Sequence, residues 1–184
     1  LNIISSTLQY NRALTTTGGA IKNQGGVLTL FNSTLQHNQA ATNGGGVYSD
    51  GDDKTVISNT TIYSNTAEQD GGGFYVNKTL VITNSTFSEN YSGGQGGAGY
   101  LGGSAKASLY DSEALSNSAT KGGGLYVANG GILTSTLSTL SGNTATQQGG
   151  GLYVIGGNAQ VLLDQTTIYS NSVTEQGGGI FNQN

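Results

Sequence analysis

The 184-residue chain contains no cysteine, proline, methionine or tryptophan, and only 9% of its residues are charged. Without cysteine there can be no disulfide, and with His37 as the only histidine there is no ligand set for zinc. No apolar run approaches the roughly 20 residues that a membrane-spanning helix needs. The absent residue types therefore exclude a disulfide-stapled domain, a zinc site and a helical membrane span.

Basic residues are also scarce. Six lysines and arginines stand against ten acids, which gives a formal net charge of −4. Binding to nucleic acid needs a basic patch that neutralises phosphates, and six dispersed cations do not form one. We therefore expect no nucleic-acid partner.

Glycine, in contrast, is abundant, with 32 copies, and most of them recur in phase. A Gly-rich triplet followed by a mostly apolar position returns every 25–28 residues. The triplets begin at Gly18, Gly44, Gly71, Gly96, Gly122, Gly149 and Gly177. Such a regular period is typical of a solenoid and argues against a disordered low-complexity chain.

An asparagine keeps the same period, with an apolar or small residue three positions before it and a small residue two positions after it. The seven copies are Asn11, Asn38, Asn65, Asn90, Asn117, Asn143 and Asn171. Two markers in constant phase indicate seven copies of one structural unit. We expect the asparagines to stack in a ladder at an inward corner, with every amide hydrogen bonded.

Apolar residues alternate with polar ones inside each unit, for example at Leu28/Leu30 and Leu80/Ile82, which is the period of a strand. One unit cannot bury its own apolar face, but stacked units bury a continuous core. The sequence therefore predicts an all-β, right-handed parallel β-helix of about seven coils, with three short strands per coil. Residues 1–184 form a single β-helix domain, which we expect to be a segment of a longer chain. Gly99 interrupts an apolar position, so looser packing is predicted in its coil.

The repeat resembles that of the polymorphic outer-membrane proteins, in which Gly-Gly-Ala precedes Ile, Leu or Val and Phe-x-x-Asn follows. Gly18-Gly19-Ala20-Ile21 and Phe87-Ser88-Glu89-Asn90 match both motifs literally, and the other copies match with substitutions. The chain is also similar to Gly-rich β-helix surface proteins of the pectin-lyase-like group. The resemblance implies a secreted or cell-surface passenger used in adhesion, and it transfers no catalytic residue.

Acidic residues gather at only one place, where Asp50, Asp52 and Asp53 share a predicted corner. Neighbouring coils add no carboxylate there, so a solvated turn is the first interpretation and weak Ca²⁺ binding the second. Carbohydrate-active enzymes need clustered acids and bases, and no such cluster is found. We therefore expect no enzyme, no catalytic residue and no cofactor.

Aromatic residues occupy the second position after the triplets: Tyr48, Tyr75, Tyr100, Tyr126, Tyr153 and Phe181. Alternation predicts that they point outward and form a surface stripe. Two interpretations stay open: stacking that only stiffens the sheet, or a docking surface for a glycan or a neighbouring subunit.

The predicted function is a non-catalytic, extracellular or cell-surface solenoid acting in adhesion or in self-assembly into a fibre, end to end or laterally. Possible partners are glycans and host or neighbour surfaces. The alternative is a carbohydrate-binding or carbohydrate-active β-helix whose active site lies outside this segment. Ice binding is a third option, because threonines recur at Thr7, Thr34, Thr61, Thr86, Thr139 and Thr167, interrupted by Glu113.

Overall fold

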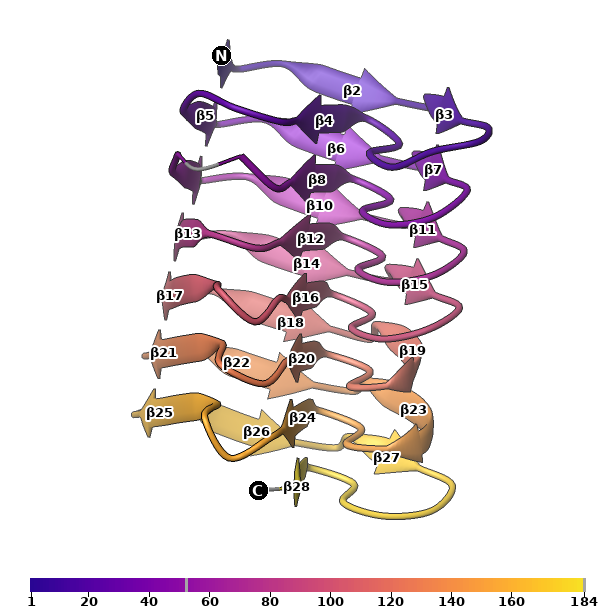
Figure 1. Cartoon of the computed structure of the whole chain (residues 1–184), viewed down its shortest axis with the longest axis vertical. Coiled ribbons are helices and arrows are strands. Elements are labelled where there is room, and N and C mark those ends of the chain that lie inside the picture. Colours follow the sequence, from indigo (N-terminus) through magenta and orange to yellow (C-terminus); the bar gives the residue numbers. More distant parts are fainter. Residues whose placement is uncertain (52, 184) are drawn as a thin grey trace.

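The computed structural model describes residues 1–51 and 53–183. Over these residues the chain winds into seven stacked coils that form a rod, with the two termini at opposite ends (Figure 1). Four seven-stranded sheets run the length of the rod, and every strand pairs in parallel with the equivalent strand of the next coil. The predicted parallel β-helix of seven coils is confirmed.

We name the sheets A to D in the order in which each coil visits them. Sheet A contains β1 (Asn2–Ile4), β5 (Leu28–Phe31), β9 (Thr55–Ser58), β13 (Thr79–Thr83), β17 (Lys106–Tyr110), β21 (Ile132–Thr136) and β25 (Gln160–Asp164). Sheet B contains β2 (Thr7–Gln9), β6 (Thr34–Gln36), β10 (Thr61–Tyr63), β14 (Thr86–Ser88), β18 (Glu113–Leu115), β22 (Thr139–Ser141) and β26 (Thr167–Tyr169).

Sheet C contains β3 (Arg12–Ala13), β7 (Gln39–Ala40), β11 (Thr66–Ala67), β15 (Tyr91–Ser92), β19 (Ser118–Lys121), β23 (Thr144–Gln148) and β27 (Ser172–Val173). Sheet D contains β4 (Ile21–Asn23), β8 (Val47–Ser49), β12 (Phe74–Val76), β16 (Gly99–Leu101), β20 (Leu125–Val127), β24 (Leu152–Ile155) and β28 (Ile180–Gln183).

Four strands per coil correct the predicted three. The additional strand is that of sheet C, which follows the repeated asparagine and has only two residues in most coils. Its inward residue is usually alanine, such as Ala40 and Ala67, both fully buried. Two residues are too few to show a period of two, so the alternation pattern could not reveal this strand.

The core is one continuous cluster of mostly aliphatic side chains, enclosed by the sheets. Leu30, Ile57 and Ile82 occupy the same position on β5, β9 and β13 and are fully buried. In-register pairing places each side chain over its equivalent in the next coil, so one long core forms without any helix in the described residues.

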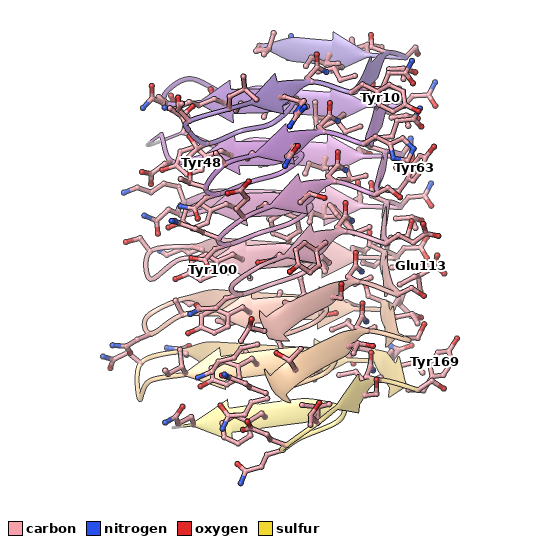
Figure 2. All side chains as sticks on the ribbon, turned by 90° about the vertical axis from the view of Figure 1, so that its right-hand side faces the viewer. Tyr10, Tyr48, Tyr63, Tyr100, Glu113 and Tyr169 are labelled. Atoms are coloured by element: carbon pink, nitrogen blue, oxygen red, sulfur yellow. The ribbon has the colours of Figure 1, made fainter. Side chains whose placement is uncertain are left out.

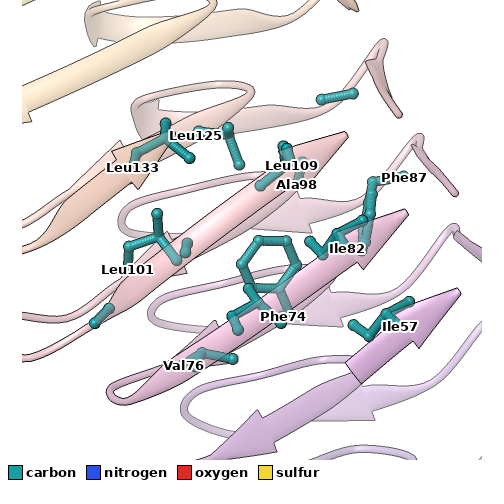
Figure 3. Packing of buried hydrophobic residues seen from close by; sticks show 14 of the residues in the cluster. Ile57, Phe74, Val76, Ile82, Phe87, Ala98, Leu101, Leu109, Leu125 and Leu133 are labelled. Atoms are coloured by element: carbon teal, nitrogen blue, oxygen red, sulfur yellow. The ribbon is translucent and has the colours of Figure 1, made fainter. Parts of the chain in front are cut away.

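The coil of Gly99 is not loosely packed, and that prediction is wrong. The ring of Phe74, on the preceding coil, occupies the space above Gly99, where an added Cβ would lie 2.0 Å from its Cζ atom. Phe74 is fully buried and meets Phe87 edge to face, with ring centroids 5.1 Å apart (Figure 3). A large residue and a small one on adjacent coils therefore share one position of the core.

Candidate functional site

The seven repeated asparagines stand in one file at the corner between sheets B and C. Within the file, each residue except the last uses its main-chain N–H and its Nδ2 to bond the Oδ1 of the next asparagine, at 2.9–3.0 Å. Asn65 also donates to the carbonyl oxygens of Leu35 and Tyr63 and is fully buried. Because these amide groups are committed to one another and to the backbone, the file holds coils together and offers a ligand little.

The Gly triplets also help to hold neighbouring coils together. Gly44 has a φ of 70°, in the left-handed region that glycine adopts without steric cost. A Cβ on Gly45 would lie 2.4 Å from the carbonyl oxygen of Gly72 in the next coil. The triplet thus combines a turn with a close approach of two backbones, which is a structural role.

The predicted aromatic row forms a continuous stack on the outer face of sheet D. Successive ring centroids from Tyr48 to Phe181 are 4.7–5.3 Å apart, with interplanar angles of 3–20°. Tyr48 and Tyr100 lie on the same side of the rod in Figure 2. Because the inner rings stack on both faces, each inner tyrosine can present only its edge and its hydroxyl to a partner.

Exposure of this stack is lower than predicted. Tyr126 is 6% exposed and Tyr153 is fully buried, so the expected open stripe is wrong at these two positions. In this region β19 and β23 continue to Lys121 and Gln148, whereas the strands of sheet C in the first four coils stop after two residues. The Lys121 ammonium lies 5.4 Å from the ring centroid of Tyr153. The Tyr153 hydroxyl donates to Gln183 Oε1 at 2.6 Å.

The environment of the stack raises the pKa of several of its phenols. Burial, followed by the hydrogen bond to Asp50, raises the pKa of Tyr48 to about 12. Burial raises the pKa of Tyr126 to about 12, with a smaller contribution from Tyr153. Burial also raises the pKa of Tyr75 and that of Asp70, whose charge adds to the effect on the ring. The hydroxyls of Tyr48, Tyr75 and Tyr126 therefore lose their protons less readily than a free phenol.

The acidic corner is occupied by internal hydrogen bonds. Asp50 accepts bonds from the Tyr48 hydroxyl at 3.1 Å and from Asn77 Nδ2 at 3.0 Å, and Asp53 accepts one from the Gly26 N–H at 2.9 Å. Asp52, the third predicted member, lies outside the described residues. Within the described ranges no three histidine, aspartate or glutamate side chains gather as a metal would require. Calcium binding at this corner stays a prediction.

A second aromatic group lies on the outside of sheet B and was not predicted. Tyr10 stacks on His37 with centroids 5.1 Å apart, and His37 meets Tyr63 edge to face at 5.3 Å. Beside them, Gln36 Nε2 donates to Gln9 Oε1 at 2.5 Å. Figure 2 places Tyr10 and Tyr63 on the side opposite Tyr48 and Tyr100. In the sequence, this group is indicated by the 27-residue spacing of Tyr10 and His37, which corresponds to one repeat.

The threonine row also follows sheet B, in register through Thr61, Thr86 and Thr139, with Glu113 at the equivalent position of β18. In the neighbouring outward row stand Tyr63 and Tyr169 (Figure 2). Glu113 interrupts the threonine row with a charge, and the two rings stand in the row beside it, so the hydroxyl array on sheet B is not continuous. Ice binding stays a prediction.

Comparison with known proteins agrees with this architecture. A family model described as "right handed beta helix region" matches residues 18–184. No curated protein and no solved structure matches the chain. In the described residues there is no helix that could cross a membrane. With parallel in-register coils in the structure and the family model covering nearly the whole length, the chain belongs to the right-handed β-helix family.

Proposed function

We propose that the chain is a non-catalytic β-solenoid of the cell exterior that acts in adhesion or assembles into a fibre. Catalytic sites gather titratable groups whose pKa values are matched to a reaction. Here the conspicuous polar groups support the fold: the asparagines bond one another, Asp50 accepts a bond from Tyr48 in its own coil, and Asp53 accepts one from Gly26 in the preceding coil. The long side walls remain available as contact area.

The assembly part of this proposal rests on the two end coils, which expose apolar side chains and unpaired strand edges. Beneath the last coil is a hollow of about 470 Å³, lined by Leu152, Val154, Ala159, Val161, Leu163, Ile180 and Asn182. At the other end Leu1 is 69% exposed. The outer edges of β1 and β25 carry unpaired backbone groups, which favour pairing with another strand.

The two end faces match each other. Extending the repeat register places Leu163 over Ile3, Ile168 over Leu8 and Ile180 over Ile21, so apolar side chains meet apolar side chains. The asparagine file is complementary too, because Asn171 keeps a main-chain N–H donor where Asn11 offers a free Oδ1 acceptor. The first coil of a second copy, or a further coil of a longer chain, would continue all four sheets.

Sedimentation velocity of the 184-residue polypeptide over a range of concentrations tests the proposal. We expect concentration-dependent association that Val161→Lys abolishes, because this inward side chain lines the open end. Leu162→Lys is the matched control, since its side chain is 60% exposed on the same strand and points outward. A monomer at all concentrations, or equal association of both variants, would contradict end-to-end assembly.

Membership of the polymorphic outer-membrane protein repeat family is part of the proposal. Both parts of the repeat motif have a structural role, which supports this membership. The Gly triplet forms a turn at Gly44 and a close backbone contact with the next coil at Gly45, and the asparagine is hydrogen bonded to the asparagine of the next coil. In that family such repeats imply adhesion. Binding of protein-coated beads to cell monolayers, compared with beads coated with unfolded chain, tests adhesion, and equal binding of both would refute it.

Carbohydrate binding is the second candidate, and the group of Tyr10, His37 and Tyr63 favours it. Tyr10 is 68% exposed, and the amides of Gln9 and Gln36 lie beside it, which is suitable chemistry for stacking on and hydrogen bonding a sugar. The aromatic stack on sheet D is less suited, because its inner rings, such as Tyr100, are stacked on both faces, whereas Tyr10 is stacked on His37 alone. Titration with soluble oligosaccharides, followed by the NMR signals of Tyr10 and of a Tyr10→Ser variant, tests this candidate.

A further inference from the structure

The corner between sheets A and B has one residue with positive φ in every coil. The seven residues are Ser5, Asn32, Asn59, Asn84, Asp111, Leu137 and Gln165. Short polar side chains such as asparagine tolerate this conformation because they can hydrogen bond locally. Leu137 has no such compensation, yet it adopts a φ of 51° and is 44% exposed. Neither packing nor backbone conformation explains a leucine at this position.

A second exposed apolar side chain lies beside it. Tyr110, 50% exposed, is the register partner of Thr136, the residue immediately before Leu137. Strands in a sheet lie about 4.8 Å apart, so the ring of Tyr110 and the side chain of Leu137 are diagonal neighbours on adjacent coils. Together they form an exposed apolar pair on a rigid corner.

Acidic residues surround this pair. The Asp111 N–H donates to the Thr136 carbonyl oxygen, and the Leu137 N–H donates to that of Asp164, both at 3.1 Å, so one acid lies a coil before Leu137 and one a coil after. Glu113 begins β18, at a position where the other six coils carry threonine. All three acids are exposed (Figure 2 labels Glu113).

These carboxylates are available. The structure gives Asp111, Glu113 and Asp164 no side-chain hydrogen bond or ion pair with any described residue. The lysine on the same strand as Tyr110 is Lys106, four residues away, which is about 13 Å along a strand. The corner therefore combines an uncovered apolar pair with an unneutralised negative rim.

We infer that this corner binds a basic peptide segment in which an aliphatic side chain is flanked by lysine or arginine. The aliphatic group would pack on Leu137 and Tyr110, where exposed apolar surface favours contact. The flanking cations would meet Asp111, Glu113 and Asp164, and the same carboxylates would repel acidic segments. The main members of the site, Tyr110, Glu113 and Leu137, lie on the side wall of coils five and six, whereas Asp164 belongs to the last coil. Peptide binding through the first three residues can therefore fail while end-to-end assembly holds.

A fluorescent synthetic peptide with one leucine between paired lysines and arginines is the probe, and fluorescence anisotropy with the 184-residue protein is the readout. Two further peptides are measured: one with serine for leucine and one with glutamine for the basic residues. We expect the first peptide to bind, the other two to bind at least about tenfold more weakly, and added salt to weaken binding.

Two variants restore the residues of other coils and therefore keep the fold. Leu137→Asn installs the residue found at Asn59, and Glu113→Thr installs the one found at Thr86. We expect each to weaken binding by about tenfold, with an unchanged or higher thermal midpoint for Leu137→Asn. Tyr91→Thr is the matched control, because it removes a ring that is 50% exposed on sheet C, and it should bind like the parent.

Several results would overturn the inference. They are no binding of the basic peptide to the parent protein, equal binding of the glutamine peptide, and unchanged affinity in Leu137→Asn. A lower thermal midpoint of Leu137→Asn would assign Leu137 a structural role. Loss of self-association in that variant, without loss of peptide binding, would assign the corner to contacts between copies of the chain.

Discussion

Replacing Asn65 with alanine removes one rung from the middle of the asparagine file. Asn65 Oδ1 accepts the main-chain N–H of Asn38 at 3.0 Å and its Nδ2 at 2.9 Å, and all of these groups are buried. The substitution leaves these two donors without an acceptor. A buried unsatisfied group costs about 1–3 kcal/mol, so we expect a loss of about 4 kcal/mol. Against a typical domain stability of about 5–15 kcal/mol, this is a large fraction.

Urea denaturation followed by far-UV circular dichroism measures the loss. Asn11→Ala is the internal control, since Asn11 is exposed at the end of the file and accepts no bond from another asparagine. It should cost less than about 1 kcal/mol. Because repeat arrays can unfold in parts, amide exchange of the Asn38 N–H is a second readout and should accelerate. Equal costs for Asn65→Ala and Asn11→Ala would refute the reasoning.

Two further predictions concern the core and the aromatic stack. Gly99→Ala should destabilise by about 1–3 kcal/mol because its Cβ would meet the Phe74 ring at 2.0 Å. The double variant Gly99→Ala with Phe74→Leu should lose less than the sum of the two single losses in denaturation experiments, and strict additivity would contradict shared space. The folded-state pKa values of Tyr48 and Tyr126 are about 12, above the ordinary 10.0, so their contribution to stability is complete below pH 10 and falls as the pH rises toward 12. Denaturation midpoints across this range measure it, Tyr126→Phe should flatten the dependence, and a midpoint that rises with pH would contradict the sign.

Periodicity predicted the coil number, the register and the stacking rows because each follows from one repeated pattern. What it missed depends on differences between coils. Gly99 is an exception in its own coil, but the ring that fills its space belongs to Phe74 of the preceding coil, so the fit is visible only when the two coils are stacked. Tyr153 is buried in the coils where Lys121 lies over its ring and the strands of sheet C are longer. A repeat pattern averages over such differences, so it predicts the scaffold better than the surface.

Candidate surface sites were likewise predicted where all coils share a position and missed where single coils differ. The aromatic stack was visible because every member occupies the same position, whereas the group of Tyr10, His37 and Tyr63 draws on two positions and emerged only with the fold. Leu137 is recognisable as an exception only when the positive φ of its corner position is known.

Cysteine cross-linking across one pair of coils tests the stacked register most directly, since the chain contains no cysteine of its own. Ser58 and Thr83 are register partners on β9 and β13, and their side-chain oxygens lie 2.9 Å apart. With both replaced by cysteine, mild oxidation should close an intramolecular disulfide, because neighbouring strands lie about 4.8 Å apart and disulfides span Cα distances of about 4.4–6.8 Å. The pair Ser58→Cys and Thr136→Cys, three coils apart in the same row, should keep free thiols. Free thiols in the first pair, or equal oxidation of both pairs, would contradict the stacked coil register.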